Sequence, residues 1–299
     1  MPVAQHPLAS PTIVGNTITV DMMLQNPTRV TALLADLTLQ KFLINYIFDS
    51  AGGVEGGAVI YDQPTVNELY PERDVQQVAV GAEFPIITAD RRAPKVALVE
   101  KWGGKVWIPD EAVSRNQSGV YMRELRKLAN AMVRKLNTRA IAILEAAIAA
   151  NGGNSTMAGS DWSAVVMTGT TPTVSTATPF ADFMRAQLAA DTMELGISFD
   201  TVLVNPTQRY EMYVAYEGAG IPVQPLLDSA GMRMVWSNRV PLGTAYMIAS
   251  GQLGELRVEK PLGTETWREP KTERNWTQTS WRGVMYVTNP FAVMKLTGL

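Results

Sequence analysis

The sequence predicts an α+β fold, and three observations lead to this class. A long amphipathic helical pattern covers residues 118–150 approximately, directly after a strand-like run that ends in "KVWI". Helical and strand patterns then alternate between residues 179 and 250. Strand patterns dominate the last forty residues. Helices and strands that are grouped along the chain in this way are typical of an α+β protein.

The composition allows a sizeable core and excludes several kinds of active site. Of the 299 residues, 46% are hydrophobic, which is enough for a large globular core. The net charge of -2 provides no overall attraction for nucleic acid or for a membrane surface. The chain has no cysteine and one histidine, His6, so disulfides, thiolate sites and histidine-based triads are excluded. No run of about 18 apolar residues predicts a membrane span.

The first part of the chain has little apolar surface to bury against itself. Residues 1–28 alternate proline, glycine, threonine and valine, so we expect an extended arm that is ordered where it lies on another surface. Asn26 and Pro27 then suit the cap and first position of a short helix, followed by an apolar stretch. The glycines of "SAGGVEGGAVIY" (50–61) predict a flexible joint or a set of tight turns.

Residues 66–108 are predicted to be rich in β-structure. Two strand-like runs, "VQQVAVGAEFPII" and "KVALVEKWGGKVWI", are separated by "TADRRAP", which predicts an elongated two-stranded ribbon with a polar tip near residues 90–92. A lone hairpin is marginal in water, so this ribbon needs a neighbour, and a second copy of the chain would serve. Trp102 and Trp107 would face opposite sides of an ideal strand, unless the glycines between them add a bulge.

The helix that follows is longer than a globular core requires. Pro109, Asp110 and Glu111 suit a helix start, and the main pattern runs from Val120 to Ala150, about 45 Å at 1.5 Å per residue. Its apolar face carries Leu125, Leu128, Met132, Leu136 and Ile143. Its opposite face carries Arg123, Arg126, Lys127 and Arg134. Such a basic face is either solvated or in contact with an acidic partner or nucleic acid.

The second half resembles a layer of helices on strands. Residues 153–178 read as loop, 179–196 as a helix and 201–204 as a short buried strand. Asn205 caps a further helix that begins at Pro206. Strand patterns follow at 232–240, 245–250, 255–260, 264–269, 275–289 and 292–298.

We find no catalytic constellation, metal site or cofactor motif in the sequence. "GGVEGG" lacks the spacing of a phosphate-binding loop. Asp110 and Glu111 are explained by the helix start rather than by an acid/base pair. The seven tryptophans could stack on bases, but tryptophans more often fill a core or an interface.

Four segments in this order resemble the major capsid proteins of tailed phages of the Hong Kong 97 type, a fold shared with encapsulin shells. They are "KVWIPDEAVSRNQ", "FDTVLVNPTQRYEMYVA", "VWSNRVPLGTAYMIAS" and "SWRGVMYVTNPFAVMKLTG". The sequence departs from the family at Pro109, where serine is frequent, and at the ribbon tip, where arginines replace lysine. Some relatives are cross-linked through a lysine of this loop, but Lys95 lies off the tip, so we expect no covalent cross-link here.

The resemblance implies a division of the chain into the parts of that fold. It implies an N-terminal arm over 1–40 and an extended β-hairpin loop over 70–97. The peripheral domain, which contains the long spine helix, would comprise 41–69 and 98–178. An axial domain would cover 179–254, and 255–299 would supply return strands of the peripheral domain.

The resemblance also implies a function: a self-assembling shell of hexamers and pentamers around double-stranded DNA, bound without sequence specificity. The virion capsid would be assembled in the host cytoplasm, with scaffolding, portal and decoration proteins as further partners, and without a membrane or cofactor. The subunit contacts we expect involve Ile13, Val14, Ile18, Val20, Phe84, Ile86, Ile87, Arg91, Arg92, Tyr216, Pro222 and Pro225. Inner-face candidates near DNA are Arg123, Lys127 and Arg134.

Two alternatives remain open from the sequence. An encapsulin-type nanocompartment would have the same fold and enclose protein cargo instead of a genome. An enzyme with an α/β core at 179–250 and a β-rich lid belongs to a different class, and it would require a catalytic constellation that converges in a deep pocket.

Overall fold

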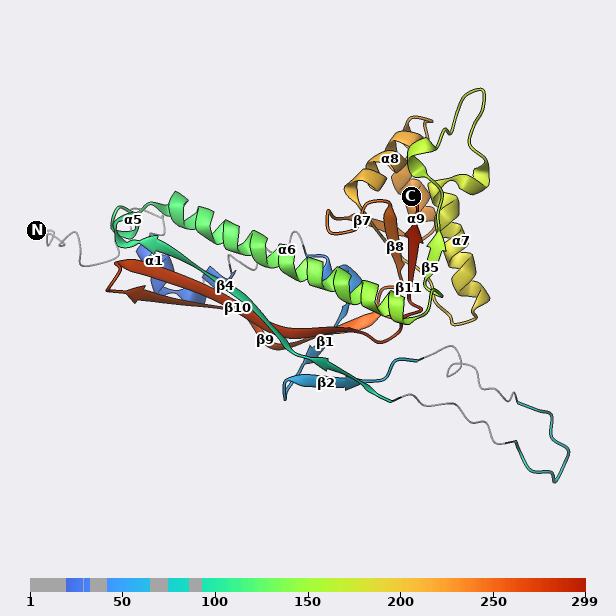
Figure 1. Ribbon diagram of the computed structural model, residues 1–299, viewed down its shortest axis with the longest axis horizontal. Helices are drawn as coiled ribbons and strands as arrows, with labels where there is room; N and C mark the ends of the chain where they lie inside the picture. The colour runs from blue at the N-terminus through green and yellow to red at the C-terminus, as the bar shows by residue number, and fades with distance from the viewer. Residues whose placement is uncertain (1–19, 29, 33–41, 65–74, 86–92) are drawn as a thin grey trace, which may run out of the picture.

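The computed structural model describes residues 20–28, 30–32, 42–64, 75–85 and 93–299, and it has two joined bodies (Figure 1). One is elongated, with a long helix lying along a long sheet. The other is rounder and lies at one end, where a second sheet is covered by helices. The predicted α+β class is therefore confirmed.

The elongated body is built on a four-stranded sheet. Its strand order is β1 (Asp49–Gly53), β9 (Gly254–Glu269), β10 (Arg274–Val287) and β4 (Glu100–Pro109). The strands β9 and β10 form a long antiparallel hairpin, β4 is antiparallel to β10, and β1 is parallel to β9. The register of the hairpin shifts between Ser280 and Gly283 of β10, where β9 has extra residues between Val258 and Gly263, and this marks a β-bulge in β9.

The long helix α6 (Ser118–Ala150) lies across one face of this sheet, after the short helix α5 (Asp110–Ser114). Its 33 residues contain no proline, and Gly119 stands in the first turn, so nothing interrupts the hydrogen-bond ladder. The apolar face predicted from the sequence is buried at Leu125, Leu128, Met132 and Leu136 and half-buried at Ile143. The predicted spine helix is therefore present.

Small residues allow α6 to approach the sheet closely. In β10, Thr277 and Thr279 face the helix side and are buried, and the hydroxyl of Tyr121 on α6 lies 3.3 Å from that of Thr277. A Cβ atom on Gly104 of β4 would lie 2.7 Å from the end of the Leu128 side chain, so glycine leaves room for Leu128 at this position.

The glycines of β4 add no bulge. The strand pairs with β10 in continuous register from Glu100 to Pro109. Trp102 is therefore on the helix side and half-buried, whereas Trp107 is exposed on the other side, next to its partner Trp276. The strict alternation of an ideal strand applies here.

The rounder body is built on a five-stranded sheet covered by helices. The strand order is β5 (Thr156–Ala158), β11 (Val293–Thr297), β8 (Thr244–Ile248), β6 (Thr201–Val204) and β7 (Arg233–Trp236). The helices are α7 (Pro179–Thr192), α8 (Pro206–Glu217) and α9 (Val223–Ser229), with 3₁₀ turns at Trp162–Ala164 and Ser175–Ala177. As predicted, Asn205 caps α8: its side chain accepts a hydrogen bond from the Thr207 amide at 3.0 Å.

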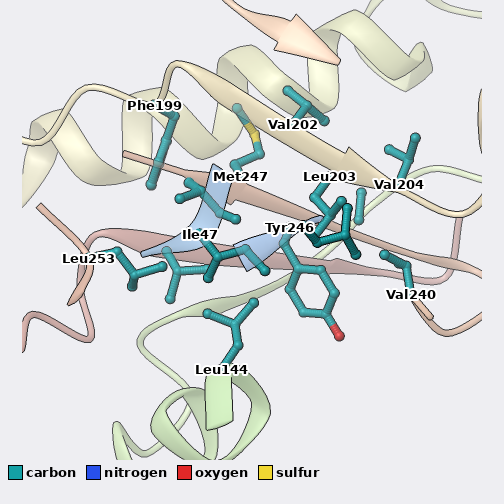
Figure 2. Close-up of a cluster of buried hydrophobic side chains, with 14 of the residues drawn as sticks. Ile47, Leu144, Phe199, Val202, Leu203, Val204, Val240, Tyr246, Met247 and Leu253 are labelled. Carbon is teal, nitrogen blue, oxygen red and sulfur yellow. The ribbon is translucent and has the colours of Figure 1, made fainter. Parts of the chain in front are cut away.

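A shared core joins the two bodies (Figure 2). Leu144 of α6 and Ile47 of α3 (Ile44–Ile47) pack against side chains of the five-stranded sheet, among them Tyr246. Beside this core, the Lys295 ammonium contacts both carboxylate oxygens of Glu145 at 2.7 and 2.8 Å, and the Tyr246 hydroxyl donates to the same carboxylate. Burial and this carboxylate raise the pKa of Tyr246. The end of α6 is thus fixed to the rounder body.

The last strand lies in a different sheet from the one that the sequence predicted. Residues 255–299 were expected to return to the elongated body, and β9 and β10 do so. The last strand, β11, instead pairs with β8 and β5 in the five-stranded sheet. The tight turn at Asn289 to Ala292, closed by a 3.2 Å backbone hydrogen bond, redirects the chain between the two sheets.

The extended ribbon also differs from its prediction. Its two strands are β2 (Ala58–Tyr61) and β3 (Lys95–Leu98), which pair with each other in antiparallel register. Residues 75–85, expected to be a strand, have no strand structure, and a turn at residues 79–82 is closed by a 3.0 Å backbone hydrogen bond. Figure 1 places this segment far from both bodies. The predicted tip at residues 90–92 lies outside the described residues.

Candidate assembly surfaces

The ribbon is anchored to the long sheet through its inner face. Val59 packs with Val284 and Tyr286 of β10, and the rings of Tyr61 and Tyr286 lie 4.7 Å apart. The Tyr286 hydroxyl donates a hydrogen bond to Glu255 of β9. Burial and this carboxylate raise the pKa of Tyr286 to about 12, and the hydrogen bond lowers the pKa of Glu255. The inner face of the ribbon is therefore covered by its own subunit.

The outer face of the ribbon is apolar and open. Ile60 is 72% exposed, its cross-strand partner Val96 is 60% exposed, and Leu98 is 70% exposed. Side chains alternate between the two faces of a strand, so the inward position of Val59 requires that Ile60 points outward. Phe84, farther along the loop, is 79% exposed. Such a contiguous exposed apolar surface is typical of an interaction site.

A groove runs beside this outer face. It lies between β3 and the C-terminal half of α6 and has a volume of about 680 Å³. Val96, Leu98 and Ile143 line it, together with the small side chains of Ala146 and Ala150. The alanines leave room above the helix, so the groove can accept an apolar segment.

The predicted contact at Val20 is wrong. Residues Val20–Gln25 form a helix, α1, instead of an extended arm. Val20 is 1% exposed and packs on Ile108 and Tyr121 of its own subunit. Its amide donates a hydrogen bond to the Asn116 side chain at 2.9 Å. Val20 is therefore part of the core between the long helix and the sheet of its own subunit. Ile13, Val14 and Ile18 lie outside the described residues.

The predicted contact at Tyr216 is also wrong. Its ring is 3% exposed, and its hydroxyl accepts a hydrogen bond from the Phe180 amide at 3.1 Å. This residue therefore joins α8 to α7 within the subunit. Pro222 and Pro225, at the start of α9, are exposed, and their contact with a neighbour stays a prediction.

Four further contact candidates, Ile86, Ile87, Arg91 and Arg92, lie outside the described residues. Nothing in the structure tests them.

The basic side chains of α6 are exposed and differ in their surroundings. Arg123 is exposed, and Lys127 forms an ion pair of 2.6 Å with Glu124. Arg134 lines a second cleft, of about 870 Å³, together with Arg209 and Arg239. The sequence analysis missed these two arginines, because they come from α8 and from the turn after β7, far from α6 in the chain.

The carboxylate that could have belonged to an acid/base pair has a structural role. Asp110 accepts hydrogen bonds from Arg268 at 2.7 Å and from Asn275 at 2.5 Å. It thereby ties the start of α5 to the β9–β10 hairpin. Within the described residues, no group of three or more histidine, cysteine, aspartate or glutamate side chains could hold a metal ion. Among the described helices, none is long and apolar enough to cross a bilayer.

Known proteins with this fold are capsid and particle proteins. A family model described as "Phage capsid protein" matches residues 92–296. No curated protein matches the sequence. Among solved structures, the virus-like particle from Pyrococcus furiosus is 13% identical, with a TM-score of 0.63, over 90% of this chain and 98% of that chain.

Two further structures show the same likeness. A structure from Mycobacterium phage Bobi is 14% identical, with a TM-score of 0.61, over 87% of this chain and 89% of that one. A phage-related protein of Bordetella bronchiseptica is 11% identical, with a TM-score of 0.58, over 89% and 96%. At identities this low, the structural likeness establishes the fold alone. The family match covers well over half of the sequence. The chain therefore belongs to the phage capsid protein family, and it is a major capsid protein with the Hong Kong 97-type fold.

Proposed function

We propose that this capsid protein assembles into hexamers and pentamers of an icosahedral shell that encloses the double-stranded DNA of a tailed phage. The observation that carries the proposal is the open outer face of the ribbon, with Ile60, Val96 and Leu98 exposed. A subunit that left this face in water would forgo a large hydrophobic stabilisation. Repeated heterologous contacts in closed rings would bury it in every copy.

The magnitude of this stabilisation fits an assembly of many weak contacts. Full burial of one large aliphatic side chain contributes about 1.5–3 kcal/mol. The three ribbon side chains would together contribute roughly 5–9 kcal/mol per subunit, before the cost of ordering the loop. Each contact is modest, and the closed shell multiplies it through multivalency.

The groove beside the ribbon supplies an acceptor for a neighbouring subunit. An apolar loop side chain such as Phe84 would fit between the ribbon and the alanine-lined end of α6. Pro222 and Pro225 of α9 would meet their copies at the ring centre. The segment before Val20 would lie along an adjacent subunit.

The assembly test uses the full-length chain, purified and imaged by negative-stain electron microscopy. We expect closed shells of uniform diameter or, without a scaffolding partner, rings and curved sheets. A compact monomer by light scattering at high concentration would contradict the proposal and would favour the enzyme alternative.

A truncation test isolates the N-terminal segment. Deletion of residues 1–19 leaves the buried Val20 in place. The truncated subunit should therefore fold normally but assemble poorly. Deletion of 1–25 would remove α1 from its own core as well. Normal shells from the shorter truncation would rule out a role of this segment in assembly.

The chain is a component of the virion capsid, and we infer that assembly takes place in the host cytoplasm, without catalysis by the chain. Membership of a structural family and the structural role of Asp110 support the absence of an enzymatic function. Scaffolding, portal and decoration proteins are further partners that the family membership suggests.

The likeness to the Pyrococcus furiosus virus-like particle favours one second candidate, a protein-filled nanocompartment. Extraction of particles from the native source distinguishes the two functions. Double-stranded DNA of uniform length supports the capsid, whereas one abundant co-purifying protein without DNA supports the nanocompartment.

A further inference from the structure

The second cleft lies where the two bodies meet on the α6 side of the molecule. One wall comes from the middle of α6, with Asn130 and Arg134, and from Tyr46 of α3. The other wall comes from the start of α8 and from the turn after β7, where Trp236 and Arg239 stand. Its volume of about 870 Å³ exceeds that of the groove beside the ribbon.

The charge of this cleft is uniformly positive. Arg134, Arg209 and Arg239 line it, and no carboxylate is among its lining residues in the described part of the chain. Six other arginines of the described residues form ion pairs, but these three form none there. The cleft therefore concentrates three cations although the chain as a whole carries a net charge of -2.

The Arg209 side chain is held between aromatic rings, and its Nε atom lacks a hydrogen-bond partner. Its guanidinium lies 3.6 Å from the centre of the Trp236 ring and 5.0 Å from that of Tyr213. Its Nε atom is buried without a partner within the described structure. A buried donor without an acceptor is costly, so this arginine is not fully satisfied within its own subunit.

The chemistry of the cleft fits phosphate groups. An arginine whose flat face stacks on an aromatic ring keeps its N–H edge for a bidentate contact with phosphate oxygens. The helix α8 begins at Pro206 in the cleft wall, so the positive end of its dipole adds to the same field. The amides of Asn130 and Asn238 offer further donors.

We propose that this cleft, formed by Arg134, Arg209 and Arg239 with Trp236, holds a phosphate-bearing strand of the packaged DNA against the inner wall of the shell. The inference rests on the proposed function, because it requires that the shell encloses DNA. It assigns the α6 side of the subunit to the interior. Three contacts per subunit would order the outermost DNA. They would also allow its release, because phosphate contacts weaken as the salt concentration rises.

The test measures binding of a short labelled DNA duplex to the full-length chain before assembly, by fluorescence anisotropy over a series of salt concentrations. Each phosphate contact contributes about 0.9 to the slope of log affinity against log salt. The variant Arg134→Gln/Arg209→Gln/Arg239→Gln should lower that slope by about 2–3.

A matched control removes three positive charges from α6 outside the cleft. Arg123→Gln/Arg126→Gln/Lys135→Gln alters three exposed cations of α6, and the slope should change little. An equal loss in both variants would overturn the proposal in favour of diffuse attraction by the helix. Tighter binding of an oligoglutamate peptide than of the duplex would overturn it in favour of an acidic protein partner.

Two further measurements locate the ligand. Trp236 is 49% exposed in the cleft, so DNA should change its fluorescence, and the change should disappear in Trp236→Phe. An undiminished change in that variant would place the DNA elsewhere. Electron microscopy of the triple arginine variant separates this inference from the proposed function. Normal assemblies with an unaltered salt slope refute the cleft alone, whereas an unmodified chain that stays a compact monomer refutes assembly.

Discussion

Two four-residue strands of similar composition differ in how far they are buried in this subunit. The strand β6, "TVLV", is buried at every position, whereas β2, "AVIY", buries Val59 and exposes Ile60. The strand β6 has a neighbour on each side and helices above it, and β2 has one partner in a two-stranded ribbon. The difference shows that the rounder body is complete within one chain and the ribbon is not.

The largest expected effect concerns the open face of the ribbon. The variant Ile60→Ser/Val96→Ser/Leu98→Ser should leave the free energy of unfolding of the subunit within about 0.5 kcal/mol. It should remove roughly 5–9 kcal/mol of assembly free energy per subunit, so no shells form at concentrations that suffice for the unmodified chain. Electron microscopy and urea unfolding measure the two quantities.

Val59→Ser is the matched control for the inner face of the ribbon. It should destabilise the subunit itself, because Val59 packs on Val284 and Tyr286. Normal shells from the triple variant would mean that the outer face is not an interface.

Substitutions in the core of the rounder body should instead change the free energy of unfolding of the subunit. Leu203→Ala in β6 removes a side chain that is 0% exposed, and it should lower the free energy of unfolding by about 2–5 kcal/mol. Leu188→Ala in α7, where leucine is exposed, should change it by less than about 0.5 kcal/mol. Urea midpoints at constant m-value give both numbers, and equal effects would refute the assigned core.

The anchor of the ribbon on the long sheet should be sensitive to alkaline pH. The pKa of Tyr286 is raised from 10.0 to about 12 in the folded state. The stabilisation from its neutral hydroxyl is therefore complete below pH 10 and is lost as the pH rises through 12. Over this window the unmodified subunit should lose on the order of 2 kcal/mol more than Tyr286→Phe.

The same hydrogen bond acts at acid pH with the opposite sign. The pKa of Glu255 is lowered, so its contribution is present above its ordinary pKa and is lost as the pH falls through the lowered value. Tyr286→Phe should weaken this acid dependence, measured by urea unfolding at each pH. Tyr210→Phe, at an exposed position on α8, is the control. If its pH profile matched that of Tyr286→Phe, the hydrogen bond between Tyr286 and Glu255 would not be the cause.

The smallest expected effect is at the cap of α8. Asn205→Ala removes the acceptor for the Thr207 amide and should cost about 1 kcal/mol. Asn205→Asp keeps this acceptor and loses the donor to the Val240 carbonyl, a 2.7 Å bond. Thermal unfolding should place Asp between Asn and Ala, and equal loss in both variants would assign the effect to the Val240 bond.

Features that depend on neighbours in sequence were predictable. The helix period over 118–150, the Asn-Pro cap of α8 and the alternating strand β10 each follow from side chains a few residues apart. The order of these patterns was sufficient to predict the fold family. Local patterns carry this information because period and capping are set within a few turns or strand residues.

Features that depend on partners far away in sequence were not predictable. Nothing in the segment around β11 indicates which of two sheets it joins, since a short and mostly apolar strand suits either. Val20 and Tyr216 look like free apolar side chains until their own subunit covers them. The basic cleft combines residues from α6, α8 and the turn after β7, and no spacing in the sequence connects them.

The bulge of β9 opposite Ser280 to Gly283 has a consequence for the proposed assembly into both hexamers and pentamers. A regular antiparallel hairpin as long as β9–β10 resists bending, because every rung would have to deform. An interrupted register concentrates flexure at one place and leaves the pairing on either side intact. In the proposed shell, the far end of the hairpin would tilt more steeply in a pentamer than in a hexamer.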